Sequence, residues 1–210
     1  MKPYLKITRN NMPFHKTRSF FPALTHATKL HGYTGSFAKL RFLWDRTKDH
    51  WLQVISRIMP YNGVRIKMQR MRGVRIGRGV HLGPLVTIDD VYPYFVRIED
   101  GACISGQTFI IAHSIPDDYY SDATESFVAP VVIGKNVWLA INVVIHPGVT
   151  IGQGSIVASG SVVTKSIPPF VMAAGTPAVV KKDIADRVRK NYSDKEFERI
   201  LAKRKEEYGF

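Results

Sequence analysis

An aliphatic residue returns every six positions through much of this chain, and that period limits the possible folds more than any other feature. From Ile133, six consecutive units run in frame: IGKNVW, LAINVV, IHPGVT, IGQGSI, VASGSV and VTKSIP. From Ile76, the units IGRGVH, LGPLVT and IDDVYP precede a short slip, after which IEDGAC and ISGQTF continue the pattern. A period of six fits neither an amphipathic helix, which repeats every ~3.6 residues, nor an alternating strand, which repeats every ~2.

The period predicts a coil with three short, flat sides, in which each hexapeptide forms one side. The leading aliphatic residue of each unit points inward, and Gly or Asn at the corners permits the tight turns. Three units make one coil of about 18 residues, and successive coils stack at roughly 4.8 Å. The expected fold class is therefore all-β, a parallel β-helix that spans residues 63–182.

The regular pattern is interrupted in the segment IIAHSIPDDYYSDATESFVAP, residues 110–130. We expect a loop over residues 112–131 that leaves the coil beside His113. The repeat resumes in frame at Ile133.

The segments on either side of the β-helix have helical patterns. Apolar residues recur at helix-like spacings before Pro60, so the basic N-terminal segment, residues 1–62, is expected to be partly helical. Its apolar stripe is expected to pack on its own domain or on a neighbouring subunit, with interfacial membrane contact as the alternative. In residues 183–210, Ser193 and Glu196 have the spacing of a capping box, which predicts a C-terminal helix.

The net charge of +13 is concentrated near the N-terminus. Residues 1–82 hold 17 Lys and Arg residues but only two acidic residues, Asp45 and Asp49. Such a segment is either a solvated surface or attracts an anionic partner. No helix-turn-helix, zinc-finger or RNA-binding signature is present, so we expect no nucleic acid partner. Peripheral contact with an anionic membrane surface stays open.

Cysteine usage and hydropathy bear on the compartment. The single cysteine, Cys103, cannot form an intrachain disulfide, which fits a reducing cytoplasm. No apolar run approaches the roughly 18 to 20 residues that span a bilayer, and charges and prolines interrupt residues 1–30, unlike a signal peptide. We therefore expect a cytoplasmic protein, peripheral at most at the inner membrane face.

The repeats, the histidine beside the loop and the segment NVWLAINVVIHPGVTIGQGSIVASGSVVTKSIPPFVMAAGTPAVVKK together resemble the hexapeptide-repeat acyltransferases. Within that superfamily, residues 63–182 are most similar to the sugar O-acetyltransferases that act on maltose, galactosides or surface polysaccharides. The resemblance implies a left-handed β-helix, a homotrimer with active sites between subunits, and acetyl-CoA as the acetyl donor. It also implies a saccharide acceptor, such as a surface glycan or its precursor, and no metal.

By the same resemblance, His113 occupies the position of the family histidine after which the loop leaves the coil. Its imidazole has an ordinary pKa of about 6.5, which suits it to remove the proton of an attacking hydroxyl near neutral pH. His113 is therefore the expected general base. Glu125 matches the family's loop glutamate, and its carboxylate either holds the imidazole tautomer or binds acceptor hydroxyls.

Asp89 and Asp90 lie in the stretch TIDDVYPYFVRIEDG, which resembles the polysaccharide acetyltransferases more than the maltose or galactoside enzymes. Family aspartates in this neighbourhood reach the acceptor, so both residues are candidates for acceptor binding. Structural capping of the interruption in the coil is the alternative.

The remaining candidates match positions that contact coenzyme A in similar enzymes. These residues are Trp138, Ile141, Ser159, Thr164, Lys165 and Lys182. The contacts at Ile141 and Ser159 are expected through backbone amides, and the lysines are expected to neutralise phosphates. For Trp138, the alternative to a contact with the ligand is ordinary packing between coils. Val179 stands where the family has an arginine, which puts the adenosine contacts in doubt.

Three other functions stay open. The acceptor could be the amine of an amino-sugar or an antibiotic, which an acceptor panel would decide. A metalloenzyme like the gamma-class carbonic anhydrases needs three histidines at one metal, two of them close in sequence. Here His81, His113 and His146 lie 32 and 33 residues apart. The third function is that of a non-catalytic scaffold. The presence of both His113 and Glu125 argues against it.

Overall fold

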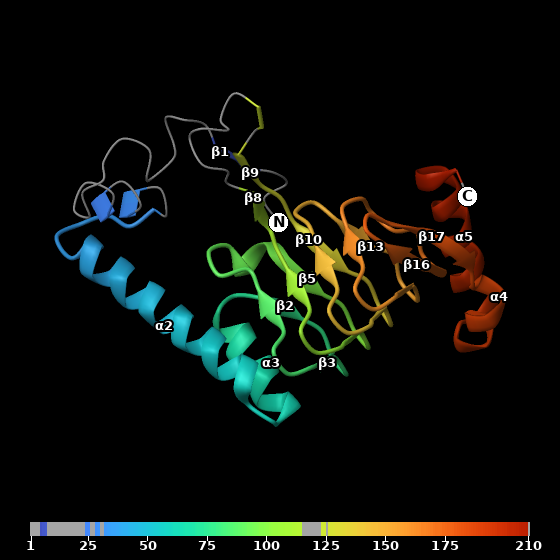
Figure 1. Cartoon of the computed structure of the whole chain (residues 1–210), viewed down its shortest axis with the longest axis horizontal. Coiled ribbons are helices and arrows are strands. Elements are labelled where there is room, and N and C mark those ends of the chain that lie inside the picture. Colours follow the sequence, from blue (N-terminus) through green and yellow to red (C-terminus); the bar gives the residue numbers. More distant parts are fainter. Residues whose placement is uncertain are drawn as a thin grey trace.

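The computed structural model describes residues 5–7, 24–25, 28–29, 32–114, 123–124 and 126–209. Figure 1 shows a coil of short strands with helices at either end. The strands form the left-handed parallel β-helix that the repeat and the resemblance predicted.

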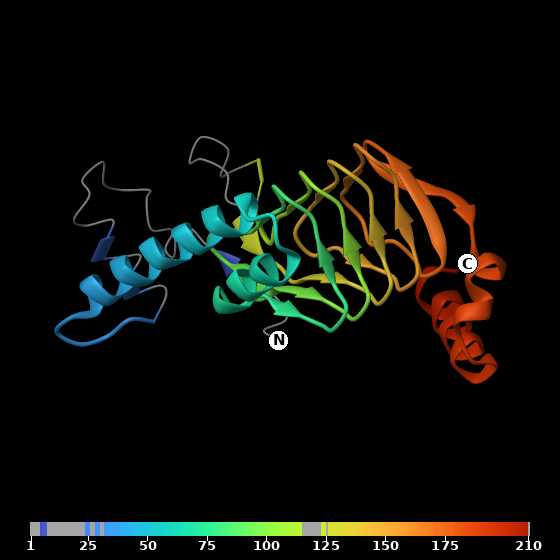
Figure 2. The same cartoon turned by 90° about the horizontal axis from the view of Figure 1, so that it is seen from below.

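Three parallel sheets form the three sides of the coil, and Figure 2 shows them from a second direction. The first side contains β2 (Arg75–Ile76), β5 (Val96–Ile98), β10 (Val131–Ile133) and β13 (Thr150–Ile151). The second side contains β3 (His81–Leu82), β6 (Cys103–Ile104), β11 (Trp138–Leu139), β14 (Ile156–Val157), β16 (Val171–Gly175) and β17 (Ala178–Asp183). The third side contains β4 (Thr87–Ile88), β7 (Phe109–Ile110), β12 (Val144–Ile145) and β15 (Val162–Val163). All neighbours are parallel except β17, which turns back against β16.

The leading aliphatic residues of the hexapeptides stack into buried ladders. On the third side, Ile88 pairs with Ile110, Ile110 with Ile145, and Ile145 with Val163. All four side chains are fully buried. Burying one such side chain contributes roughly 1.5–3 kcal/mol, so the ladder both holds the coil together and fixes its register. The inward position that the repeat predicted is confirmed.

Two corners of the coil require backbone in the left-handed region. Asn136 and Asn142 occupy these corners with φ of 53° and 60°, as expected of a residue type that tolerates this region. The neighbouring coil has Gly101 at the first corner with φ of 71°. A Cβ atom there would lie 2.1 Å from Asn136 Oδ1, so a larger residue would displace the Asn136 side chain in addition to straining the backbone at positive φ.

Both interruptions of the repeat occur at the same corner, where the chain passes from the third side to the first. Ile133 and Ile151 are paired neighbours 18 residues apart. The paired residues Ile76 and Ile98 are 22 apart, and Ile98 and Ile133 are 35 apart. The extra residues thus leave the coil without changing its register.

Short elements occupy this corner. The first interruption contains the 3-10 helix η2 (Pro93–Phe95). The second contains β8 (His113–Ser114) and β9 (Ser126–Val128), which pair antiparallel with each other. The strand β1 (Leu5–Ile7) adds to β9, so the N-terminal part of the chain reaches the arms of the loop.

Two helices cover the beginning of the coil (Figure 2). The expected N-terminal helix is confirmed as α2 (Ala38–Ile58). The β-helix does not begin at residue 63 as expected, because α3 (Asn62–Met71) continues the helical part and the first coil strand starts at Arg75. Arg65 of α3 fastens this helix to the first coil, since its guanidinium donates to the Leu82 carbonyl at 2.6 Å.

The C-terminal helix closes the other end. The chain continues through α4 (Ala185–Val188) and the 3-10 helix η4 (Arg189–Asn191) into α5 (Asp194–Tyr208). Ser193 Oγ accepts from the Glu196 amide at 3.4 Å, which confirms the expected N-cap. Phe197 of α5 stacks on Phe170 at 5.2 Å between ring centroids. Among the described helices, none combines the length and apolar character that crossing a bilayer requires.

Candidate active site

The corner with both interruptions brings Asp89 and His113 together. Asp89 directly follows Ile88, and His113 comes three residues after Ile110, the ladder partner of Ile88. The Asp89 amide donates to the Ile110 carbonyl at 2.9 Å. This pairing leaves Asp89 Oδ2 2.7 Å from His113 Nδ1.

Asp89 is a buried carboxylate with four hydrogen-bond partners. Oδ1 accepts from the amides of Val91 at 3.0 Å and Tyr92 at 2.7 Å. Oδ2 accepts from the Ala112 amide at 2.6 Å and faces His113. Burial acts to raise the pKa of Asp89, but the hydrogen bond from His113, its charge and the backbone donors outweigh burial, so the pKa is lowered. Asp89 is therefore ionised at neutral pH.

An ionised Asp89 decides which nitrogen of His113 carries the proton. A carboxylate only accepts hydrogen bonds, so Nδ1 is the protonated nitrogen and Nε2 keeps its lone pair. The hydrogen bond to Asp89 raises the pKa of His113, against the opposing effect of burial. The His113 side chain is 24% exposed, and the Tyr92 ring packs against it edge-on at 5.7 Å. The result is an oriented base that solvent, and hence a ligand, can reach.

A buried polar network holds the backbone beside Asp89 in place. Arg72, just after α3, donates to the Ile88 carbonyl at 3.1 Å and the Asp89 carbonyl at 2.8 Å. Its guanidinium also donates to Gln53 of α2 at 2.6 Å and Gln69 of α3 at 2.8 Å. Gln53 in turn donates to the Ile88 carbonyl at 2.9 Å. Both N-terminal helices are thus fastened to the strand end that carries Asp89.

Sequence reasoning missed this network. Arg72, Gln53 and Gln69 look like ordinary polar residues of basic helices, and only their burial in the fold distinguishes them. The Asp89–His113 pair had a signal, because the slip after IDDVYP falls at the same point of the coil as the longer loop. Aligning the two interruptions on one corner would have put the two side chains together.

The predicted acceptor residues have different surroundings. Asp89 was expected to reach the acceptor, but its side chain has no exposed surface and its oxygens already face four partners. Its geometry is that of the alternative, a cap on the coil interruption, with the added role of orienting His113. Asp90 is exposed beside it, and its charge helps raise the pKa of His113. Glu125 lies outside the described residues.

The same residues are close enough to consider a metal ion. One ligand atom each from Asp89, Asp90 and His113 lies within 4.8 Å of the others. The Asp89 oxygens are, however, taken up by three backbone amides and the imidazole. A metal ion would have to displace the hydrogen bond to His113. The absence of a metal stays a prediction.

All six positions expected to contact coenzyme A are exposed. Ile141 and Ser159 occupy one corner on successive coils, where the Gly160 amide donates to the Ile141 carbonyl at 3.0 Å. Thr164 and Lys165 lie at the opposite edge of the third side, two coils beyond the strand that leads to His113.

The other two expected contacts lie on the second side. Trp138 is on β11, and its indole donates to Ser105 Oγ at 3.3 Å. Lys182 is on β17, as is Val179, which is 50% exposed. A single chain therefore distributes the expected coenzyme A contacts over several surfaces and does not gather them around His113.

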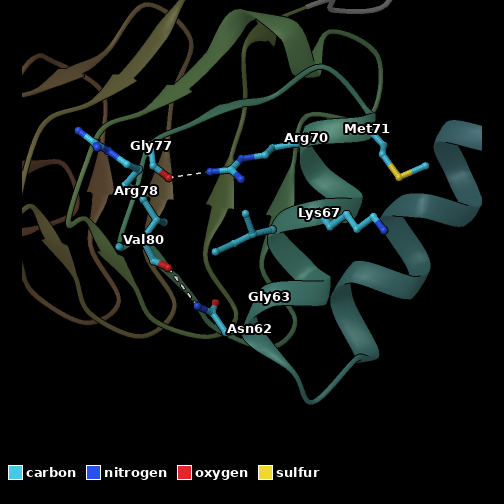
Figure 3. Close-up of a pocket in the computed structure, with 10 residues that line it drawn as sticks. Asn62, Gly63, Lys67, Arg70, Met71, Gly77, Arg78 and Val80 are labelled. Carbon is cyan, nitrogen blue, oxygen red and sulfur yellow. Dashed lines mark hydrogen bonds between the residues drawn. The ribbon is translucent and has the colours of Figure 1, made fainter.

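Three hollows are lined entirely by described residues. The largest of these three, of about 810 Å³, lies between α3 and the first coil and is lined by Lys67, Arg70 and Arg78 among others (Figure 3). Arg70 donates to the Gly77 carbonyl at 2.8 Å across it. The others lie along the first side, with about 370 Å³, and beneath α5, with about 420 Å³. They do not include His113.

Known sequences match part of this chain. The family model described as "Bacterial transferase hexapeptide (six repeats)" matches residues 130–165. The galactoside O-acetyltransferase of Escherichia coli (strain K12) is 39% identical over 121 residues, 57% of this chain and 58% of the relative. The chain thus spans less than two thirds of that protein's length.

A second relative is covered more fully. WcaF of Escherichia coli (strain K12), whose name assigns it to colanic acid biosynthesis as an acetyltransferase, is 35% identical over 132 residues, 54% of this chain and 71% of the relative. Among solved structures, a hexapeptide-repeat acetyltransferase from Vibrio cholerae O1 biovar eltor, complexed with acetyl coenzyme A, superposes with a TM-score of 0.54 and 26% identity. That match covers 73% of this chain and 94% of the Vibrio chain.

Proposed function

Because the chain belongs to the hexapeptide-repeat acetyltransferases, we propose that it transfers the acetyl group of acetyl-CoA to a hydroxyl group of a saccharide. The observation that carries this proposal is the hydrogen bond of 2.7 Å between buried Asp89 and partly exposed His113 at the point where the loop leaves the coil. The relatives are named as sugar or polysaccharide acetyltransferases, which supports a surface glycan or its precursor as acceptor.

In the proposed reaction, His113 is the general base. Its Nε2 takes the proton of the acceptor hydroxyl as the oxygen attacks the acetyl carbonyl of the thioester. The tetrahedral intermediate then collapses, the carbon–sulfur bond breaks, and the imidazolium returns the proton to the departing thiolate. The products are an acetyl ester and free coenzyme A, and no acyl-enzyme is formed. Asp89 holds the Nδ1–H tautomer and stabilises the imidazolium.

The donor site and the homotrimer belong to the same proposal. Ile141 and Ser159 lie across the third side from the corner of His113, about five residues at roughly 3.3 Å each. A neighbouring subunit that packs against the third side would bring its own coenzyme A positions next to His113. Light scattering should then give three times the chain mass of 23.7 kDa, and a monomer with full activity would refute the shared site.

We also include peripheral contact with an anionic membrane surface, at the cytoplasmic face of the inner membrane. The support for this contact is the charge of residues 1–82, which contain 17 basic residues and only two acidic ones.

The donor is tested first, because this test needs no knowledge of the acceptor. A ligand at 100 times its Kd stabilises the native state by about 2.7 kcal/mol, so acetyl-CoA should raise the unfolding temperature clearly. Saccharides and, as the rival class, amines and antibiotics are then screened by thiol release. No shift with acetyl-CoA in a trimeric sample would reject the donor and point to the altered position at Val179.

The base is tested by His113→Ala. We expect acetyl transfer to fall by about 10² or more, with the acetyl-CoA thermal shift retained because His113 is not needed to bind the donor. His146→Ala is the matched control, since His146 is exposed on a different coil. Near-normal turnover in His113→Ala would reject the assignment.

A further inference from the structure

The outward face of α2 and its N-cap Phe37 carry a stripe of large, exposed apolar side chains. Among the described residues, the one aromatic contact of the stripe is that of Trp51 with its neighbour His50, at 5.9 Å between ring centroids. Phe37, Trp44, Trp51 and Ile58 recur every seven residues, and Leu40 lies on the same face. They are between 58% and 71% exposed. Exposed apolar patches of this kind mark interaction surfaces.

The stripe lies opposite the buried face of the helix. The residues of α2 that are buried are Phe42, Asp49, Leu52, Gln53 and Ser56. At about 100° per residue, these residues face α3 and the coil, while the apolar stripe lies on the other side of the helix. The stripe is therefore not needed for the core that α2 shares with the rest of the chain.

Charge selects the partner. At the same angular spacing, Lys39 and Arg57 flank the stripe on one side, and Arg41 and Lys48 on the other. The acidic residues of α2, Asp45 and Asp49, turn toward the buried side. Asp45 accepts from Tyr33 at 2.6 Å and from Lys48 of one flank at 3.0 Å, and Asp49 pairs with Arg46 at 2.8 Å. An apolar face between two rows of cations is the pattern of a helix that lies in the interface of an anionic bilayer.

We propose that α2 is a membrane-docking helix, which lies on an anionic lipid surface with Trp44 and Trp51 at the level of the headgroups. Trp is the side chain best suited to that boundary, because its ring is apolar and its N–H is polar. A second copy of α2 is a poorer occupant, since it would bring cations against cations along both flanks. A nucleic acid would satisfy the cations and leave the apolar stripe in water.

The docking helix lies next to the candidate active site. On its inner face, Gln53 bonds the Ile88 carbonyl at 2.9 Å and Arg46 bonds the Val91 carbonyl at 3.3 Å, on either side of Asp89. A helix is about 10 Å across, so the pair of Asp89 and His113 would stand roughly one helix diameter above the lipid. That height suits an acceptor glycan that is itself attached to the membrane.

Two further features of the molecule agree with this orientation. The hollow of Figure 3, next to α2, adds the exposed side chains of Lys67 and Arg78. Both figures of the whole chain place α5 at the opposite end of the coil from α2. Docking through α2 would therefore leave the far end of the β-helix in solution.

The test is flotation of the full chain with vesicles of phosphatidylcholine alone, or mixed with phosphatidylglycerol. We expect binding only to the anionic vesicles, reduced at least about ten-fold by the double substitution Trp44→Ser and Trp51→Ser. Trp138→Ser is the matched control, because it removes an exposed tryptophan of the coil. Lys39→Ala with Lys48→Ala should weaken binding, whereas Lys195→Ala with Lys205→Ala on α5 should not.

Fluorescence gives a second readout in which the docking face itself is left unsubstituted in the main measurement. The chain has three tryptophans, Trp44, Trp51 and Trp138. In Trp138→Phe, the remaining emission comes from α2, and brominated lipids should quench it. In the double variant Trp44→Phe and Trp51→Phe, the emission of Trp138 should be unaffected.

Three results would overturn the proposal: equal binding to neutral and anionic vesicles, unchanged binding of the Trp44 and Trp51 variant, or lipid-independent association of trimers that this variant abolishes. The last result would assign α2 to a contact between copies of the chain. The inference rests on the membrane contact included in the proposed function. Since vesicle binding is measured without acetyl-CoA or acceptor, its failure would leave the proposed acetyl transfer standing.

Discussion

Asp89→Asn isolates the effect of the buried carboxylate on His113. The four groups that face the Asp89 oxygens are all donors: the amides of Val91, Tyr92 and Ala112, and Nδ1–H of His113. An asparagine has only one oxygen, so its NH₂ group must face one of the two pairs. If the NH₂ group faced Val91 and Tyr92, the backbone amides of both residues would lose their acceptor.

Facing Ala112 and His113 is the less costly orientation. Only the Ala112 amide then loses its acceptor, because the imidazole can move its proton to Nε2 and accept from the new amide at Nδ1. One unsatisfied buried amide costs about 1–3 kcal/mol, which we expect as the loss of stability. The nitrogen that should act as base is then protonated, so kcat should fall by about 10²–10⁴.

The pH dependence should change in a defined direction. In the wild type, we expect the rate to rise with pH through the raised pKa of His113, since only a neutral imidazole can accept the proton of the hydroxyl. Without the carboxylate, the pKa of His113 should fall, so the remaining rate should begin its rise at a lower pH than in the wild type. The lowered pKa of Asp89 means that its stabilising contribution is present above the ordinary Asp pKa and is lost as pH falls through the lower folded value. The variant should lack this part of the acid sensitivity.

The tautomer is measured directly by ¹⁵N NMR of the imidazole, which needs no acceptor. We expect Nδ1–H in the wild type and Nε2–H in Asp89→Asn, and Asp90→Asn serves as the control because Asp90 is exposed. The reasoning is refuted if Asp89→Asn keeps the Nδ1–H tautomer, or if its kcat and pH profile match the wild type.

Other predictions concern the support of the site and the coil. Arg72→Lys keeps the charge but replaces the guanidinium that bonds four acceptors, so it should lower stability by about 1–3 kcal/mol and lower kcat, measured by denaturant unfolding and thiol release. Ile145→Ala opens a cavity in a fully buried ladder and should cost about 2–5 kcal/mol in the same unfolding assay. Prolonged treatment with a chelator should leave turnover unchanged and elemental analysis should find no zinc; about one zinc per chain, with activity lost on chelation, would instead support a metal at Asp89, Asp90 and His113.

The coil could be predicted because its cause is local and repeated. Each inward residue, such as Ile133 or Leu139, needs the same buried position, and the tight corners need a residue such as Asn136 that accepts positive φ. The loop position followed from the frame. The capped C-terminal helix followed from Ser193 and Glu196, since an N-cap involves residues only three apart.

The parts that could not be predicted depend on contacts between distant residues. Arg65 and Gln69 are polar and lie in a basic segment, so nothing local indicates that α3 packs against the first coil. The role of Asp89 as the partner of His113 depends on two residues 24 positions apart returning to the same corner. Sequence reasoning offered that role to Glu125, with acceptor binding as the alternative, because Glu125 lies closer to His113 in the chain.

The corner where both interruptions leave the coil has a consequence for how such proteins diversify. Because the ladder from Ile98 to Ile133 closes as well over 35 residues as the ladder from Ile133 to Ile151 does over 18, insertions there do not disturb the register of the core. Loop length can therefore change through evolution or engineering while His113 and Asp89 stay fixed by the strands beneath them. We expect that exchanging residues 115–125 between relatives leaves the register of the coil intact, so such chimaeras would test whether this segment selects the acceptor.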